Sequence, residues 1–112
     1  MFNTNILDEI LKTQREKLNS ERVYLLNKVA ETLRRIQQKY GIQKAYIVGS
    51  LAIAYRWHQF SDVDVAVSGC SARVLNIMKE LEEATGKVVD VIDLDSHPFP
   101  DSFSRKGLKI CG

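Results

Sequence analysis

The sequence has few of the residues that mark specialised classes of protein. Its 112 residues include only two cysteines and two prolines, and the net charge at pH 7 is +2. Cys70 and Cys111 are far apart, which excludes a disulfide-rich secreted scaffold and a cysteine metal cluster of known spacing. So small a net charge gives no indication of direct nucleic-acid binding, because that would require a strongly basic face.

Long apolar runs and a signal-like start are also missing. No segment approaches the roughly 20 apolar residues of a membrane-spanning helix. The opening stretch, MFNTNILDEILKTQREKL, mixes acids with apolar residues, unlike the uncharged core of a signal peptide. Hydrophobic residues make up 45% and charged residues 27% of the chain, as in ordinary folded domains. We therefore expect a cytoplasmic protein with reduced thiols and no membrane partner.

Apolar residues recur at helical spacing in several segments. In the first forty residues, Asn19-Ser20 interrupts this pattern, which predicts two helices with Ser20 capping the second and Gly41 ending it. Ser71 and Gly86 likewise predict the start and end of a later helix. The predicted helices cover 4–19, 21–40, 51–56 and 72–85.

Short apolar runs between the helices predict three strands, at 44–48, 62–67 and 87–94. The tail from residue 95 holds both prolines and predicts turns plus a short helical or extended piece. The order of elements indicates a small α/β (α+β) domain with a three- to four-stranded mixed sheet flanked by helices. We divide the chain into an N-terminal helical extension, 1–20, and one domain, 21–112.

Two aspartates lie in an otherwise apolar predicted strand. Asp62 and Asp64 are two residues apart, so in a strand they point to one face, about 6.5 Å apart along it. Two carboxylates this close repel each other, and the repulsion grows away from water. A cation between them would remove that repulsion, so the pair predicts a metal site.

Asp90 and the Gly49-Ser50 turn extend this candidate site. If the strand of Asp90 pairs with the strand of Asp64, three carboxylates converge, and oxygen-only ligands suit Mg²⁺ or Mn²⁺. A pair of such ions is the usual device for phosphoryl transfer. Gly49 lets the backbone approach an anion closely, and the Ser50 hydroxyl can donate a hydrogen bond to phosphate. The site therefore combines metal binding with phosphate binding.

These motifs resemble the minimal nucleotidyltransferases (MNT) of the DNA polymerase β superfamily. The family pattern is Gly-Ser, about ten residues, Asp-x-Asp in a strand and a later single Asp. Gly49-Ser50, Asp62-Val63-Asp64 and Asp90 follow it, with a loop one residue longer than the commonest spacing. The resemblance covers residues 25–110 and implies the nucleotidyltransferase fold.

The resemblance also implies an activity and a partner. Members transfer a nucleoside monophosphate, usually AMP from ATP, to a hydroxyl. Asp62 and Asp64 would bind two Mg²⁺ ions, and Asp90 would bind the catalytic ion and help to deprotonate the acceptor. Gly49 and Ser50 would hold the β,γ-phosphates. Small members often act as antitoxins of a helical HEPN toxin, either attaching AMP to a toxin tyrosine or binding the toxin.

The sequence departs from the family just after the Gly-Ser motif. Many members read Gly-Ser-x-Ala-Arg-Gly, but here Ile53 and Ala54 replace the Arg and the Gly. Arg56 is the candidate substitute for the missing phosphate contact. This departure keeps a second hypothesis open, in which a catalytically weak or silent module neutralises its partner by direct contact.

Several other residues have simpler interpretations. By parity, Asp93 faces away from Asp90, and Asp95 lies past the strand end in solvent. We interpret His58 as a loop histidine and Trp57 as packing or as a stacking surface, while Ser61 is a candidate to orient Asp62. The first helix has three open roles: homo-oligomerisation, docking to a helical partner, or folding back on its own domain.

Overall fold

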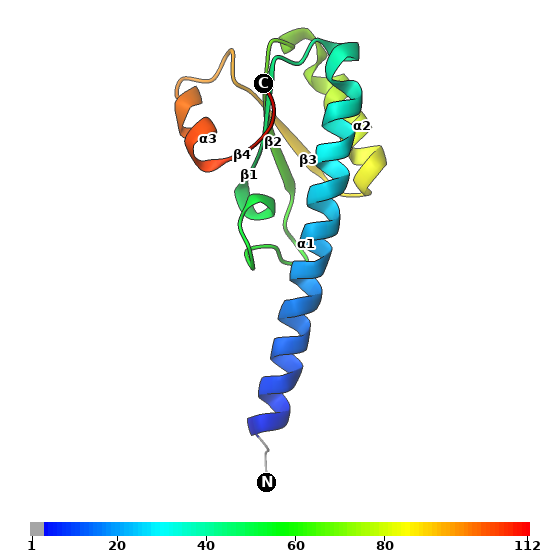
Figure 1. The fold of residues 1–112 in the computed structure, drawn as a ribbon, viewed down its shortest axis with the longest axis vertical. Helices are drawn as coiled ribbons and strands as arrows, with labels where there is room; N and C mark the ends of the chain where they lie inside the picture. Colours follow the sequence, from blue (N-terminus) through cyan, green and yellow to red (C-terminus); the bar gives the residue numbers. More distant parts are fainter. Residues whose placement is uncertain (1–3) are drawn as a thin grey trace.

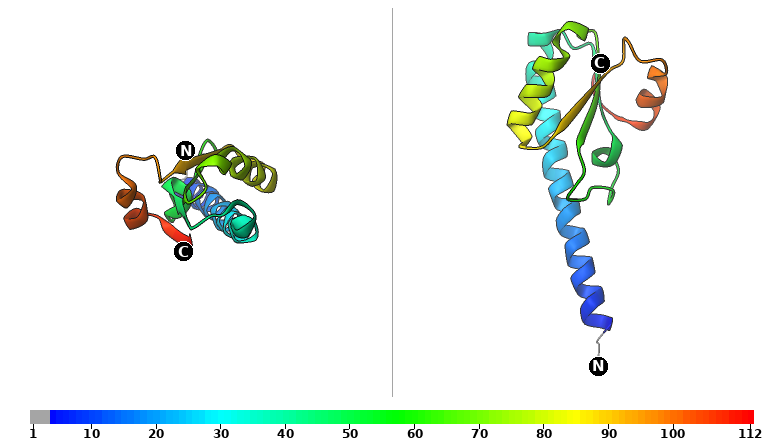
Figure 2. Two further views of the ribbon diagram at one scale, coloured as in Figure 1. Left: turned by 90° about the horizontal axis from the view of Figure 1, so that it is seen from above. Right: turned by 180° about the vertical axis from the view of Figure 1, so that it is seen from behind.

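One helix determines the outline of the molecule. The computed structural model describes residues 4–112, and in it α1 (Thr4–Tyr40) runs far beyond the rest of the chain (Figure 1). The Cα radius of gyration is 16.3 Å and the extents are 60 × 28 × 19 Å, whereas a compact chain of this length would have a radius of about 13 Å. The excess comes from residues 4–18, which project as an arm (Figures 1 and 2).

The predicted break at Asn19-Ser20 is wrong, because α1 continues through both residues. The Asn19 side chain does not compete with the helix backbone. Its oxygen accepts hydrogen bonds from Arg22 Nε at 2.9 Å and from the Tyr55 backbone N–H at 3.0 Å. Gly41 ends the helix as predicted, with φ +69°. The division into 1–20 and 21–112 stays a prediction, and its first three residues lie outside the described part of the chain.

The strands form one four-stranded mixed sheet in the order β3-β2-β1-β4. β1 pairs antiparallel with both β2 and β4, while β2 and β3 are parallel and are joined by a helical crossover. This sheet confirms the predicted fold class, with strand ends displaced from the predicted ones by at most two residues. The strands are β1 (Lys44–Val48), β2 (Val63–Ser68), β3 (Val89–Asp93) and β4 (Leu108–Cys111).

The shorter helices differ from prediction in detail. The predicted helix 51–56 is wrong: a 3₁₀ turn, η1 (Gly49–Ala52), takes its place and ends because Ile53 is extended. A second 3₁₀ turn, η2 (Ser71–Arg73), leads into α2 (Val74–Thr85), and no side-chain hydrogen bond caps either one, so the predicted Ser71 cap is also wrong. The predicted short helical or extended piece of the tail is both in turn, since α3 (Pro100–Lys106) precedes β4.

The two faces of the sheet carry different layers. α1 and α2 cover one face, and α3 lies over the other (Figure 2). Alternate strand residues supply the two cores: Val63, Val65 and Val67 of β2 pack beneath α1 and α2. Ala66 faces the smaller core, which contains Phe103 of α3. Among the described residues, no helix combines the length and apolar character needed to cross a bilayer.

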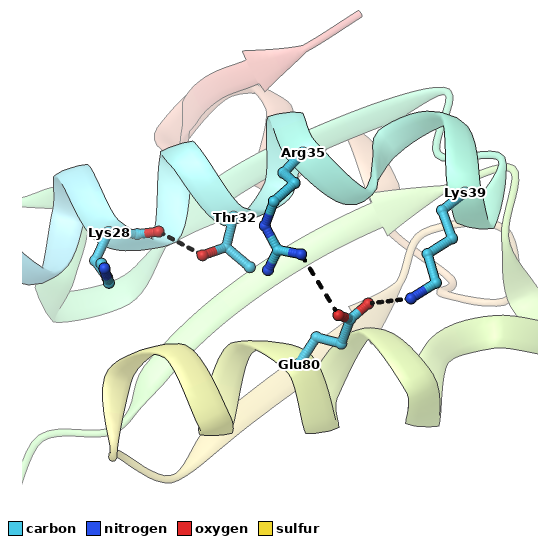
Figure 3. A network of polar contacts seen from close by, with 5 residues as sticks. All are labelled: Lys28, Thr32, Arg35, Lys39 and Glu80. Atoms are coloured by element: carbon cyan, nitrogen blue, oxygen red, sulfur yellow. Dashed lines mark hydrogen bonds and ion pairs between the residues drawn. The ribbon is translucent and has the colours of Figure 1, made fainter.

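A carboxylate on α2 ties the two long helices together. Glu80 lies 3.7 Å from Arg35 Nη1 and 3.4 Å from Lys39 Nζ, both on α1 (Figure 3). Both basic side chains are largely exposed, so water and salt screen the two ion pairs and each contributes little to stability. The buried side chains Leu33, Ile36, Ile77 and Leu81 therefore supply most of the stability of this layer.

Candidate functional site

The register of the parallel strands brings two of the predicted acids together. Asp64 of β2 pairs directly with Asp90 of β3. Residues paired across neighbouring strands point to the same face of a sheet. Each acid lies two residues before a side chain of the smaller core, Ala66 and Ile92 respectively. Both carboxylates therefore project from the α3 face, on the same side of the sheet as one another.

Asp62 lies just before β2, in an exposed position two residues from Asp64. The effect of its charge is seen at Asp64. Burial raises the pKa of the Asp64 carboxyl above its usual value, and the charges of Asp90 and Asp62 raise it further. The charges of Asp62 and Asp90 therefore both act on the Asp64 carboxylate, although Asp90 comes from a different strand.

Gly49 closes the other side of this group. It follows Val48, which pairs with Asp64, so the end of β1 and the start of β2 lie side by side. Its φ is +70°, and a Cβ built on it would lie 2.6 Å from Asp64 Oδ2. Only glycine fits both the backbone conformation and this close contact. The Asp64 carboxylate is thus packed directly on the backbone of the Gly-Ser turn.

A cavity of about 290 Å³ lies beside this contact. Gly49 and Asp64 line one side, and Phe103 and Lys106 of α3 line another. Lys106 is the one cationic residue among the described residues of this lining. Arg56, the predicted phosphate contact, instead lines a groove beside α1, and its role at the phosphate stays a prediction.

The carboxylates of the three acids suit a hard cation, but their side chains are not arranged around a single point where an ion could bind. Within residues 4–112, no group of three or more His, Cys, Asp or Glu side chains is arranged to hold a metal ion. The fit rests on chemistry: Asp62, Asp64 and Asp90 offer only oxygen ligands, and their mutual repulsion is what a cation would relieve.

A buried arginine, which sequence reasoning missed, supports the Gly-Ser turn from behind. Arg22 of α1 is 9% exposed and donates from Nη1 to the Leu51 carbonyl in η1 at 2.9 Å. Its Nε donates to Asn19, which also holds the Tyr55 backbone. The signal in the sequence is an arginine on the apolar side of α1, one residue before Val23.

The remaining candidates have structural roles. Asp93 lies on the opposite parity to Asp90, and its carboxylate accepts from Asp95 N and Ser96 Oγ at 3.1 Å each. Asp95 is exposed, and it also accepts from the Gly69 N–H at 2.7 Å. Both contacts hold the turn after β3.

The loop before Asp62 also differs in part from prediction. Ser61 Oγ accepts a hydrogen bond from the His58 backbone N–H at 3.0 Å, and its role in orienting Asp62 stays a prediction. His58 is a loop residue whose Nδ1 accepts from the Phe60 N–H. Trp57 is buried in the main core, which confirms the packing interpretation.

Asp64→Asn should stabilise the metal-free protein at neutral pH. Because the pKa of Asp64 is raised, the folded state holds this proton more tightly than the unfolded state. Stability is therefore lost as pH rises from the ordinary aspartate value through the raised one. The variant should melt above the wild type at pH 7, and the difference should vanish near pH ~4. Asp101→Asn, exposed on α3, is the control, and equal melting of Asp64→Asn and wild type at pH 7 would contradict the repulsion.

Known structures share this fold, whereas no curated protein matches the sequence. A chain from a toxin–antitoxin crystallised with AMP-PNP superposes with a TM-score of 0.63 at 21% identity, covering 74% of this chain and 73% of that chain. A chain from a mutant MntA–HpeT toxin–antitoxin gives 0.57 at 26% identity, covering 77% and 71%. A third, from a tri-AMPylated Shewanella oneidensis HEPN toxin in complex with MNT antitoxin, gives 0.55 at 23% identity, covering 81% and 72%.

A family model matches most of the chain as well. The model described as polymerase beta, nucleotidyltransferase covers residues 27–109. This range contains all four strands except the last two residues of β4, together with the Gly-Ser turn and the three acids. The arm lies outside it. The chain belongs to the polymerase β nucleotidyltransferase family.

Proposed function

We propose that the protein transfers AMP from ATP to a hydroxyl of a partner protein, and that the partner is a HEPN-type toxin. One observation carries the proposal: Asp64 and Asp90 are in register on adjacent strands, with the Asp64 carboxylate against the Gly49 backbone. Membership of the nucleotidyltransferase family supports the reaction class. The likeness to a toxin–antitoxin chain at 26% identity supports the partner class.

In this proposal, some residues of the chain bind the phosphates and another acts on the acceptor hydroxyl. The Gly49 backbone admits the triphosphate, and the Ser50 hydroxyl donates a hydrogen bond to it. In the reaction, the acceptor oxygen bonds to the α-phosphorus as the bond from that phosphorus to pyrophosphate breaks. Asp90 takes the hydroxyl proton, and pyrophosphate leaves. Asp62, Asp64 and Asp90 would hold Mg²⁺, which supplies positive charge for the phosphates and for the transition state.

Label transfer tests this proposal. The wild-type protein is mixed with α-labelled ATP, Mg²⁺ and the helical protein encoded by a neighbouring reading frame. We expect label on the partner that survives denaturation, and no label when EDTA is present. Label from γ-labelled ATP would indicate phosphate transfer instead. No transfer from α-labelled ATP under any divalent cation would remove the enzymatic proposal.

A second candidate function follows from the replacement of the usual Arg and Gly by Ile53 and Ala54. Ile53 is half exposed and brings no charge to the phosphates. In this alternative the chain neutralises the toxin by stoichiometric contact, without turnover. Nucleotide-free complex formation that suppresses the toxin's activity would favour it.

Lys106→Met should weaken binding of Mg–ATP. Lys106 is the cation in the cavity lined by Gly49 and Asp64, so it is our candidate for the charge that Ile53 lacks. Losing one partly solvated contact to phosphate should cost about 1 kcal/mol, or roughly fivefold in Kd. Titration with a fluorescent ATP analogue measures the change. Lys106→Arg should retain affinity and Lys109→Met, on β4 outside this lining, should not reduce it; equal losses at 106 and 109 would mean general screening.

A further inference from the structure

The arm of α1 exposes an apolar stripe. Four large apolar side chains between residues 5 and 11 are at least one-third exposed, although the same helix buries Leu25 and Val29 further along. Leu7, Leu11, Gln14 and Leu18 follow one another at spacings of four, three and four, so they lie on one side of the helix. The exposed apolar side chains of the arm are Ile6 (56%), Leu7 (38%), Ile10 (49%) and Leu11 (53%), of which Leu7 and Leu11 belong to this side.

The same side of the helix forms the wall of two grooves at the base of the arm. Gln14, Lys17 and Leu18 line a groove of about 630 Å³ whose opposite wall includes Phe60, which is 80% exposed. Leu11 and Leu18 also line a neighbouring groove of about 360 Å³, with Tyr55 opposite. The stripe therefore runs from the arm's tip directly into partly apolar grooves between α1 and the loop that follows η1.

The charges beside the stripe are self-complementary. Asp8 lies near the tip, and Arg15 lies seven residues later on the same edge of the stripe. The Arg15 guanidinium sits 4.5 Å from the centre of the Tyr55 ring, at the groove. If two arms pair antiparallel about a two-fold axis between residues 11 and 14, Leu7 of one meets Leu18 of the other. Asp8 then faces Arg15 twice, once on each side of the axis.

We propose that the arm is a homodimerisation element, in which two copies of this chain pair their arms antiparallel. The tip of each arm lies in the grooves at the base of the other. A parallel two-fold arrangement would put Asp8 and Arg15 of one arm on the opposite flank of the interface from those of the other arm, so only the antiparallel arrangement pairs these charges. An isolated helix of about 15 residues is marginal in water, and pairing covers the stripe that the domain leaves open.

The arm lies outside residues 27–109, which match the nucleotidyltransferase family. The dimer is therefore independent of the proposed transfer reaction, and either proposal can fail without the other.

Charge exchange between positions 8 and 15 tests the arrangement, with mass measured by sedimentation over a concentration series. Asp8→Arg puts two Arg–Arg contacts in the dimer, and Arg15→Asp puts two Asp–Asp contacts there. Each should weaken dimerisation about tenfold or more at low salt. Mixing the two variants should restore the dimer, because every contact is then opposite in charge. Glu16→Arg makes the same charge change on the opposite side of the helix and should leave the dimer unchanged.

Leu11→Asp should yield a folded monomer, since Leu11 is exposed and its replacement leaves the domain core intact. Circular dichroism melting checks the fold of each variant. A wild-type protein that stays monomeric at every concentration overturns the proposal. So does a dimer that Leu11→Asp leaves intact, or one that mixing the charge variants fails to restore. A wild-type monomer that binds a helical partner through Leu11 would assign the stripe to another protein.

Discussion

Asp62→Asn/Asp64→Asn should reduce transfer of labelled AMP to the partner by about a thousandfold or more. Both substitutions keep the size of the side chain and remove its charge. The lost ability to hold Mg²⁺ at the phosphates is worth several kcal/mol in the transition state, and about 4 kcal/mol corresponds to a thousandfold in rate. The effect should exceed that of any single change in the cavity lining.

The measurement is the initial rate of label transfer from α-labelled ATP, with partner in excess. Asp101→Asn is the matched control, because Asp101 is exposed on α3 and does not line the cavity of Gly49 and Asp64. Wild-type rates in that control would show that the loss is specific to the two acids. Transfer by the double variant within tenfold of wild type would contradict the assigned roles of Asp62 and Asp64.

The same variant separates the two proposed functions. If the protein acts by transfer, cells that express the toxin should lose protection although the complex still forms. If it acts by contact alone, protection should persist in the absence of turnover. Complex formation by co-purification supplies the needed control, because loss of both complex and protection would report only a folding or docking defect.

The placement of Asp64, Asp90 and Gly49 beside one another was predictable because each carries a local signal. Asp64 and Asp90 each interrupt an apolar predicted strand, and in the structure the two strands are parallel with these two residues in direct register. Gly49 follows a buried strand at the point where the chain must turn. Strand alternation then fixes the face, since β2 must bury Val63, Val65 and Val67 on the other side. The alternation within each strand and the pairing between the strands agree, so the sequence places Asp64 and Asp90 on the same face of the sheet, as the structure does.

The arm and the arginine beneath the turn were not predictable in the same way. Asn19 and Ser20 are weak helix formers, and their preference costs well under 1 kcal/mol per residue. Tertiary contacts of Asn19 and Arg22 with the segment 51–55 outweigh that preference. Those partners are about thirty residues away in the sequence, and no local pattern indicates them. The local pattern therefore predicts two helices in place of α1, and it gives no sign that Arg22 is buried.

Gly49→Ala should abolish the stabilisation of the protein by Mg–ATP while costing little more folding stability than a glycine replacement elsewhere. An alanine at φ +70° pays about 1–2 kcal/mol for the left-handed backbone. Its Cβ would also lie 2.6 Å from Asp64 Oδ2, the free end of a side chain that can rotate away. The fold can therefore relieve the clash, but only by turning the Asp64 carboxylate out of the site.

Gly86→Ala separates the two effects. Gly86 has φ +68°, and a Cβ there would meet nothing within 4 Å. The Gly86→Ala variant therefore has the same unfavourable backbone conformation, but its new methyl group does not contact the site. Both variants should melt below the wild type by similar amounts, but only Gly86→Ala should gain the wild-type shift with Mg–ATP, about 2.7 kcal/mol at a ligand concentration 100-fold above Kd. If Gly49→Ala keeps that shift, the contact between Gly49 and Asp64 is not part of the nucleotide site, and the turn serves only to connect β1 to the loop.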